Sequence, residues 1–562
     1  MRYVFTFFLS TMAVLGWAQS TNAPLNDDYY HWIDRYEIKA GRVMPQIFTS
    51  VKPYKRAALV GYLDSLDQAG IFASSQDQSN LAYLRNDNWE WSRPTTNESE
   101  KPILTHFYKK KSDLLYSDLP EFDIHVNPVL YLGYGYDQDL KEDLYVNTRG
   151  VEIRGMIDRK IGFYTFLSEN QARLPSYVRT ELPFNPVVPH EGFWKGFKKN
   201  AVDFFQARAY VDFNLTRNIY MQFGHDKTFI GNGYRSLIFS DFAPPALFLR
   251  GNVKVWKINY LWQLNRVAAD VSGSAGGSGG GGGRRYPEKF IAFHHASLNI
   301  GKKLNVGVFE SVVFSPKDTV NGNAFDLSYL NPVIFYRAIE QQFGSSDNVI
   351  LGADFKYNAF RNISFYGQVV IDEFLLANVR SGDGWWANKF GFQGGIKYID
   401  VAGISNLDLQ LEANTVRPYT YSHGTQYGSY SNYRQPMAHP FGANFTELIG
   451  IVRYQPLPQL NLTFKGIQAT AGRDTLGVNW GGDILKNNSS RESDFGNTTG
   501  QGISQTVRYL DFTASYMLRH NLFVDVKQVV RTGSSDVGRY QSNTSITSVA
   551  LRWNMAQRYY DF

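Results

Sequence analysis

A two-residue alternation of apolar and polar side chains begins near Phe122, recurs up to the C-terminal end, and constrains the fold of this chain more than any other feature. In LDLQLEA (407–413) every second residue is apolar, with Asp, Gln and Glu between them. QARAYVDF (206–213) and LFVDVKQ (522–528) alternate in a similar way. Because successive side chains of a strand point to opposite faces, the pattern predicts strands with one apolar and one charged face. A soluble sandwich also alternates, so alternation alone does not distinguish it from a membrane barrel.

The connections between the predicted strands are of two kinds, short turns and long polar loops. Short turns are expected at 158–160, 215–218, 262–265, 301–303, 360–362, 401–406, 456–459 and 519–521. Long loops are expected at 169–202, 315–347, 416–443 and 471–503. Short turns at one end of the strands and long loops at the other are typical of outer-membrane barrels. With both termini on the short-turn side, the turns predict an all-β transmembrane fold, an antiparallel barrel of about 18 strands over residues 122–562.

The ends of the chain predict export to the outer membrane. MRYVFTFFLSTMAVLGWAQS has a positive Arg2, an apolar run and a small-x-small motif at 16–18, which predicts a signal peptide over residues 1–18. The chain has no cysteine, which excludes disulfides and an acylated cysteine anchor. The final residue, Phe562, resembles the C-terminal aromatic signal of bacterial outer-membrane barrels.

Residues 19–121 differ from the rest of the chain because their periodicity is helical. Asn26 is a candidate N-cap ahead of acidic residues, and KPYKRAALVGYLDSLDQAG carries apolar residues at helical spacing before Gly70. We therefore expect a small α-helical region that precedes the barrel and lies in the periplasm.

Composition agrees with a sheet protein that does not bind nucleic acid. Aromatic residues make up 15% of the 562 residues, charged residues only 19%, and the formal net charge is +6. A charge this small on a chain this long gives no reason to expect nucleic acid as a partner. The glycine tract at 272–285 interrupts the alternation and is expected to form a flexible external loop.

The stretch FGHDKTFIGNGYRSLIFSD (223–241) combines candidate catalytic side chains with two glycines. A dinucleotide fingerprint would need glycine where Ser236 stands, and no βαβ unit follows. A hydrolase site would use His225 and Asp226 with Ser236 or Ser240, but neighbouring strand residues point to opposite faces. We therefore expect a loop that glycine allows to fold into the barrel mouth, with Arg235 and Asp241 bonding its backbone.

Two other pairs of chemically active residues are expected to be structural. Asp372 and Glu373 are adjacent in VVIDEF, so they cannot flank one glycosidic bond together. His294 and His295 are split across the wall in the same way, and no His or acidic cluster has metal-ligand spacing. We expect no enzymatic activity, no metal and no cofactor.

Four segments carry a resemblance to a known family. These are GHDKTFIGNGYRSLIFSDFAPPALFLR, LSYLNPVIFYRAIEQQFGSSDNVILGAD, VVIDEF and MAHPFGANFTELIGIVRY. They resemble the Wzi capsule-assembly family, including its Bacteroidota branch with the gliding-motility surface protein RemB. The residues that match the family's loop pattern are Gly231, Gly233, Arg235, Ser236, Ser240 and Asp241. The resemblance implies an 18-stranded outer-membrane barrel with periplasmic helices that acts as a lectin for capsular polysaccharide, or as a surface adhesin of a gliding system.

Aromatic and amide side chains in the long loops are the candidate glycan contacts. Flat rings stack on sugar C–H groups, and amides and hydroxyls bond to sugar hydroxyls. The candidates are Trp385, Trp386, Tyr419, Tyr421, Tyr427, Tyr430, Asn432 and Tyr433. The alternative for the two tryptophans is the interfacial aromatic girdle that membrane barrels possess.

The expected partners are outer-membrane lipid and either surface polysaccharide or a surface adhesion machinery, and the barrel is expected to be monomeric. A porin is the rival class, because barrels of 16 to 18 strands can enclose a water channel. Charged lumen faces suit a porin, whereas long Pro- and aromatic-rich loops suit an inward-folded plug.

Overall fold

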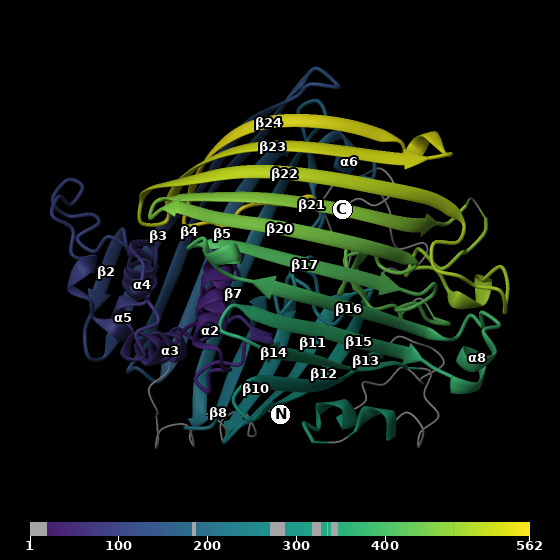
Figure 1. The fold of residues 1–562 in the computed structure, drawn as a ribbon, viewed down its shortest axis with the longest axis horizontal. Coiled ribbons are helices and arrows are strands. Elements are labelled where there is room, and N and C mark those ends of the chain that lie inside the picture. Colours follow the sequence, from purple (N-terminus) through teal and green to yellow (C-terminus); the bar gives the residue numbers. More distant parts are fainter. Residues whose placement is uncertain are drawn as a thin grey trace.

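The computed structural model describes residues 20–182, 187–269, 287–316, 327–333, 335–338, 347–425, 427–475 and 477–562. The predicted signal peptide and the glycine tract at 272–285 lie outside these residues. The centre of the fold is a closed antiparallel barrel of 18 strands, which confirms the predicted fold class (Figure 1). The barrel closes where the last long strand pairs with the first, with Val549 opposite Tyr134.

The barrel strands follow one another around the wall in chain order. They are β3 (Phe122–Asp137), β4 (Glu142–Ile157), β5 (Ile161–Arg173), β7 (Ala201–Thr216), β8 (Ile219–Asp226), β10 (Ala246–Val255), β11 (Ile258–Ala268), β12 (Glu288–Ile300), β13 (Leu304–Phe314), β14 (Asn348–Asn358), β15 (Ile363–Glu373), β16 (Lys389–Tyr398), β17 (Leu407–Val416), β20 (Phe445–Leu457), β21 (Leu460–Arg473), β22 (Ile503–Arg519), β23 (Leu522–Ser535) and β24 (Ser542–Trp553).

Helices and short strands lie at the ends of the barrel or inside it. The short strands are β1 (Val51–Lys52), β2 (Leu115–Asp118), β6 (Lys195–Phe197), β9 (Phe229–Ile230), β18 (Ser431–Asn432) and β19 (Gln435–Pro436). The helices are α2 (Asp27–Ala40), α3 (Arg56–Gln68), α4 (Ser75–Asp87), α5 (Trp89–Ser92), α6 (Ser176–Arg179) and α8 (Leu376–Ser381), with 3-10 turns η1 (Thr95–Asn97), η3 (Leu327–Leu330), η4 (Val401–Gly403), η5 (Asn488–Ser490) and η6 (Gly538–Tyr540). Helices α2 to α5 gather at the short-turn end, and α8 lies at the opposite end (Figure 1).

Local sequence explains why the N-terminal region is helical. The side chain of Asn26 accepts hydrogen bonds from the first backbone N–H groups of α2, so its predicted capping role is confirmed. Ser74 and Asp77 form a capping box at the start of α4. The apolar residues at helical spacing pack into a buried core, of which Leu63 is fully enclosed. None of the described helices has the length and apolar character needed to cross a membrane.

One predicted turn is wrong, and the others coincide with the gaps between consecutive strands, three of them overlapping a strand end by one or two residues. Residues 262–265 lie within β11, and the actual turn is at 256–257. Gln263 and Asn265 resembled turn residues because they are polar, but they are buried on the lumen side of a strand. Gln263 accepts a hydrogen bond of 2.9 Å from Arg250. A polar lumen therefore imitates a turn in the sequence.

The wall of the barrel is polar inside and apolar outside. On β22, Leu510 and Phe512 are 47% and 46% exposed on the outer face, whereas Asp511 and Thr513 are each only 2% exposed on the inner face. Large apolar side chains are exposed along many other strands as well, for example Phe223 and Leu448. This arrangement suits a barrel surrounded by lipid.

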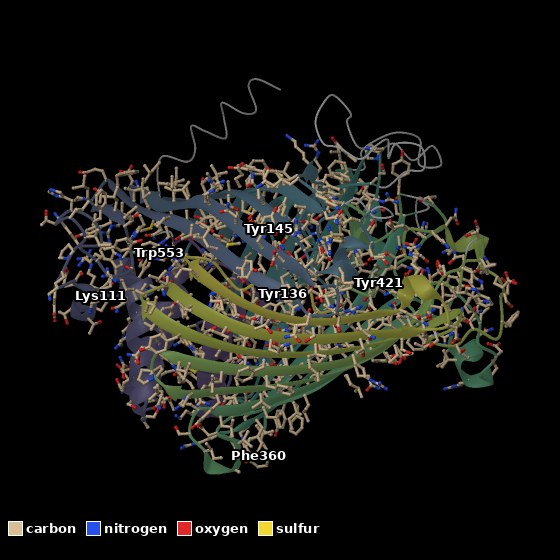
Figure 2. The ribbon with its side chains drawn as sticks, turned by 90° about the horizontal axis from the view of Figure 1, so that it is seen from above. Lys111, Tyr136, Tyr145, Phe360, Tyr421 and Trp553 are labelled. Atoms are coloured by element: carbon tan, nitrogen blue, oxygen red, sulfur yellow. The ribbon has the colours of Figure 1, made fainter. Side chains whose placement is uncertain are left out.

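The C-terminal residues leave the wall, so Phe562 does not end a strand, although it resembles the C-terminal aromatic signal of barrels. Strand β24 stops at Trp553, and residues 554–562 fold back into the barrel. The ring centroids of Phe562 and Phe242 lie 5.5 Å apart. The backbone carbonyl of Phe562 accepts a hydrogen bond from Arg531. The aromatic residue that ends the last strand is Trp553, which stacks on Tyr108 near the helical end (Figure 2).

We therefore expect Trp553, rather than Phe562, to be the aromatic residue that assembly of the barrel requires. We expect Trp553→Ala to lower the amount of inserted, heat-modifiable barrel several-fold, because it removes the aromatic end of the closing strand. Deletion of Phe562 is expected to change that amount less than about twofold. It alters no strand, so its effect on stability should be as small as that of a typical surface substitution. Trp256→Ala, at a 73% exposed turn position, is the matched control. The assignment is wrong if losing Phe562 impairs insertion more than losing Trp553.

Candidate functional site

Three of the segments that fill the lumen lie far apart in the sequence. They are the N-terminal stretch around β1, the loop 227–245 after β8, and the C-terminal tail 554–562. Strand β1 pairs with β9 of that loop, with Val51 opposite Ile230, and so forms a two-stranded ribbon inside the barrel. Apolar residues of the loop join inward side chains of the wall in one buried cluster. The lumen therefore has a core of its own.

A buried charge network joins the loop, the tail and the wall. Arg235 of the loop contacts the carboxylate of Asp561 at 3.0 Å and that of Glu447 at 3.3 Å. Lys465 approaches the same Asp561 carboxylate at 2.5 Å, and Tyr234 donates a hydrogen bond to it. Burial alone would raise the pKa of Asp561, but Arg235 and Lys465 outweigh burial and hold that pKa well below its ordinary value.

The glycine pair lets the loop approach the wall closely. Gly231 has a φ of +136°, and a side chain there would collide with Gln368. A Cβ on Gly233 would lie 2.6 Å from the carboxylate of Glu412. That carboxylate also accepts hydrogen bonds from the backbone N–H groups after Gly233. The loop thus lies inside the barrel as predicted, but Arg235 bonds mainly to carboxylates rather than to loop backbone.

The candidate catalytic residues of this stretch do not form a site. Ser236 donates its hydroxyl hydrogen bond to the carbonyl of Ile230, and the ring of His225 contacts the carbonyl of Ala207. The hydroxyl of Ser240 accepts a hydrogen bond from the backbone N–H of Phe242. Each serine is thus engaged with nearby backbone, and Ser240 also donates a hydrogen bond of 3.3 Å to the carboxylate of Asp241. Among the described residues, neither serine hydroxyl is hydrogen-bonded to a histidine.

The pair at 372–373 differs slightly from expectation. A register irregularity interrupts β15 beside β16 at this point. Lys389 therefore contacts both carboxylates, Asp372 at 3.0 Å and Glu373 at 3.3 Å. The two acids act as partners of one lysine. Within the described residues, no group of three His, Cys, Asp or Glu side chains could hold a metal ion.

Most of the tyrosine loop is buried, which corrects its predicted role as an exposed glycan surface. Tyr419, Tyr421 and Asn432 are completely buried and Tyr430 is 1% exposed. Tyr421, which Figure 2 places within the outline of the barrel, donates a hydrogen bond of 2.6 Å to the carbonyl of Leu237. The loop turns inward through the β18–β19 hairpin and packs on the loop 227–245, which we call the motif loop. These four side chains therefore cannot stack on an external sugar in this conformation.

The remaining candidate contacts are partly exposed at the long-loop end. Trp385 and Trp386 lie edge to face, with ring centroids 6.4 Å apart. The guanidinium of Arg491 lies 4.1 Å from the ring of Trp386. Tyr427 is half-buried, and Tyr433 is half-buried against Phe193. We refer to Trp385, Trp386 and Arg491 as the external aromatic cluster.

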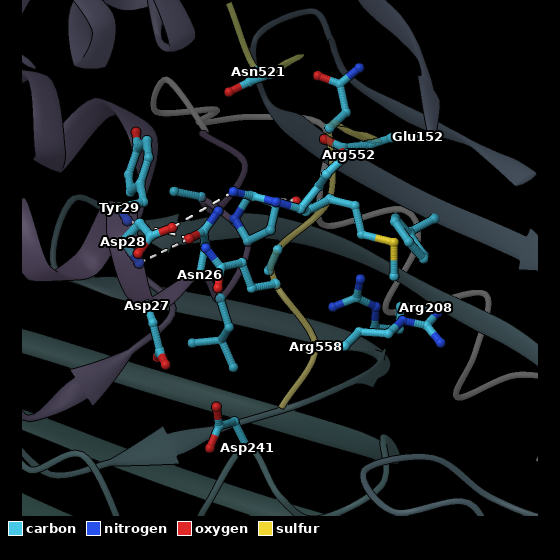
Figure 3. Close-up of a pocket in the computed structure, with 18 of the residues that line it drawn as sticks. Asn26, Asp27, Asp28, Tyr29, Glu152, Arg208, Asp241, Asn521, Arg552 and Arg558 are labelled. Carbon is cyan, nitrogen blue, oxygen red and sulfur yellow. Dashed lines mark hydrogen bonds and ion pairs between the residues drawn. The ribbon is translucent and has the colours of Figure 1, made fainter. Parts of the chain in front are cut away.

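Sequence reasoning missed a polar cavity of about 210 Å³ inside the barrel. It lies toward the short-turn end, because residues of the β22–β23 turn and of the chain just after β24 line it. Figure 3 shows charged side chains from separate segments around it. These are Asp27 and Asp28 of α2, Glu152 of β4, Arg208 of β7, Asp241 of the motif loop and Arg558 of the tail.

Two titratable groups of the loops face this cavity in uncharged or easily neutralised form. Burial, reinforced by the carboxylate of Asp27, raises the pKa of Asp241 to about 6. Burial lowers the pKa of His190 to about 3, so its ring is neutral at physiological pH. That ring lies 3.0 Å from the carbonyl of Tyr559, which ties the tail to the wall-side loop.

The chain matches no family model and no curated protein sequence. Among solved structures it resembles Wzi of Escherichia coli, which is described as an outer membrane protein involved in group 1 capsule assembly and as a carbohydrate-binding β-barrel. The TM-score is 0.58 at 13% identity, over 96% of this chain and 100% of Wzi. Pseudomonas aeruginosa OccK8 (OprE) and OprD give TM-scores of 0.41 at 9% identity, over 76% of this chain. The fold is therefore that of a Wzi-like outer-membrane barrel.

Proposed function

We propose that this protein lies in the outer membrane and holds polysaccharide at the cell surface through its long loops, with its lumen closed to solutes. The observation that carries the proposal is the filled lumen, in which Asp561 of the tail is clamped between Arg235 and Lys465. A barrel filled in this way is better suited to presenting a surface than to conducting. The likeness to a carbohydrate-binding barrel over nearly the whole chain gives further support.

The apolar outer wall and the two kinds of connection support the orientation. The long loops would face the exterior and the short turns, with helices α2 to α5, the periplasm. In this orientation the external aromatic cluster meets surface polysaccharide, while the tract at 272–285 would be reachable from outside. The barrel needs no second copy to close its sheet, because β24 pairs with β3. A monomer is therefore the expected state.

The chemistry of the external aromatic cluster fits sugar recognition. The tryptophan rings can stack on sugar C–H faces, and Arg491 can donate to sugar hydroxyls or carboxylates while it covers Trp386. Each stacked ring contributes about 0.5–1.5 kcal/mol beyond burial, so one cluster binds weakly. Retention would then arise from many barrels that engage one long polymer.

Replacement of both tryptophans by alanine tests this proposal. We expect the double variant to bind an oligosaccharide of the surface polymer about 5- to 140-fold more weakly, because two stacking contacts are lost. The measurements are affinity for that oligosaccharide in detergent and polymer retention on cells. Trp256→Ala, with an exposed ring at a short turn, should leave both unchanged. Unchanged binding by the double variant would show that the cluster is not the contact.

A role as surface adhesin of a gliding system, which the sequence resemblance also implies, would use the same external loops. The two roles separate in the same experiment, because an adhesin would lose attachment of cells to a surface while polysaccharide retention stays intact. The lectin role requires the opposite result. Absence of polysaccharide binding by the unaltered protein would remove the lectin role altogether.

A further inference from the structure

We propose that the lumenal cavity beside Glu152 and Arg558 is a second binding site, which takes a single sugar residue from the short-turn side. This inference deepens the proposed function and rests on it in one respect, namely that the sugar is a component of the polymer that the barrel retains. Residues near the short turns line one side of the cavity, whereas the external aromatic cluster lies at the long-loop end, and no residue of that cluster lines the cavity. The two sites are therefore independent of each other.

Arg558 is a cation of the tail whose hydrogen bonds go to neutral groups. Its guanidinium donates hydrogen bonds to the hydroxyl of Thr148 at 3.2 Å and to the amide oxygens of Asn170 and Gln206. Among the described residues it forms no ion pair with a carboxylate. Neutral acceptors hold the guanidinium in place and leave its charge available to a ligand.

Glu152 is an acid of β4 that lines the same cavity. Its side chain is 9% exposed, and it makes neither a hydrogen bond nor an ion pair within the described part of the chain. Arg154, two residues further along the same strand face, is instead paired with Glu90. Arg208 lies only within 3.9 Å of Asp226, at the edge of contact. A carboxylate and guanidinium groups that can still form hydrogen bonds therefore face the same cavity.

Two polar atoms of residues that line the cavity are buried without a partner among the described residues. The hydroxyl of Tyr164 and the Nε of Arg208 have no hydrogen bond within the described residues. Both residues line the cavity. Buried polar groups in proteins are nearly always satisfied, so a bound molecule or an ordered water that reaches these two atoms would complete their hydrogen bonding.

The ligand class follows from this mixture of charges. An anion would meet the carboxylates of Glu152 and Asp27, and a cation would meet the guanidinium groups of Arg208 and Arg558. A neutral sugar suits both, because each hydroxyl donates to a carboxylate and accepts from a guanidinium. The ring of Phe166 adds an aromatic wall. The volume of about 210 Å³ is below that of pockets for drug-sized ligands, which limits the occupant to about one sugar ring.

Tyr164→Phe is the sharpest variant, because it removes a hydroxyl that has no partner in the protein and keeps the ring. We expect glucose, galactose or N-acetylglucosamine to bind the purified wild-type barrel in saturation-transfer NMR. Tyr164→Phe should lower the affinity for the sugar several-fold and leave the unfolding temperature unchanged. Glu152→Gln and Arg558→Gln should weaken it about tenfold. Glu142→Gln, near the other end of the same strand, is the matched control.

Three results would overturn the inference. The first is that none of these sugars binds the wild-type protein, and the second is that all three cavity variants bind sugar as tightly as wild type. The third is that only glucuronate binds and that it binds more tightly to Glu152→Gln, which would show an anion site. The two proposals fail separately. Replacement of Trp385 and Trp386 should weaken polymer retention and leave single-sugar binding in the cavity unchanged. Retained polymer with intact cavity binding would refute the external site alone.

Discussion

Deletion of residues 554–562 is expected to turn a closed barrel into a conducting one. The tail crosses the lumen, and Asp561 is the shared partner of Arg235 and Lys465. Without the tail, buried Lys465 loses its carboxylate partner and Arg235 keeps only Glu447 at 3.3 Å. Removing one partner of a buried ion pair costs about 3–5 kcal/mol. The motif loop then loses its anchor, and a wall of 18 strands is wide enough for a water channel.

Single-channel conductance in planar bilayers measures this effect. Wild type should show no large steady conductance, the truncated protein frequent large openings, and Asp561→Asn an intermediate frequency. Deletion of Phe562 alone is the control, because it leaves the Asp561 contacts in place. Large steady conductance of wild type would support the porin alternative and refute the closed lumen. A silent truncated barrel would show that the loops alone close it.

The wall of the barrel could be predicted because its rules are local. Lipid outside and a polar filling inside impose a two-residue period on every strand, and short turns require few residues. The single wrong turn has the same origin. Gln263 and Asn265 are polar because they face the lumen, and a sequence does not show whether a polar residue faces a filled lumen or solvent.

The filling could not be predicted, because it depends on contacts between distant residues. Arg235 meets Glu447 and Asp561 across 212 and 326 positions of sequence. A loop rich in Tyr and Ser reads alike whether it stands in water or folds inward, so Tyr421 was assigned to the surface although it is buried. One signal was present, since Lys465 and Glu412 lie near the middle of predicted strands and inward charges there require partners.

The cavity was missed for a related reason. Glu152 and Arg208 were visible as charges on the inner face of their strands, but inner charges also occur in open barrels. Arg558 lies in the tail that follows the last strand, and nothing in the sequence shows that this tail folds into the barrel. Only the fold brings these three side chains to one space (Figure 3).

A second large effect is expected where the helical region is attached to the barrel. Asp34 of α2 contacts Lys356 of β14 at 2.9 Å and also pairs with Lys397 of β16. Asp34 is only 4% exposed. Asp34→Asn leaves both lysines without this charge, so we expect a loss of about 3–5 kcal/mol from the docking of the helices. Protease sensitivity of residues 27–92 and the unfolding temperature measure the loss.

The pH dependence gives this prediction a sign. Burial would raise the pKa of Asp34, but Lys356 and Lys397 outweigh burial and lower it. A lowered pKa means that the stabilisation is fully present above the unfolded value of about 3.9 and is lost as the pH falls below it. Wild type and Asp34→Asn should therefore differ most between neutral pH and about pH 5, and converge only in stronger acid. Asp64→Asn, whose carboxylate is 46% exposed beside Arg85, should stay within about 0.5 kcal/mol of wild type throughout. If the two variants lose equal stability, the buried lysines do not hold α2 in the barrel.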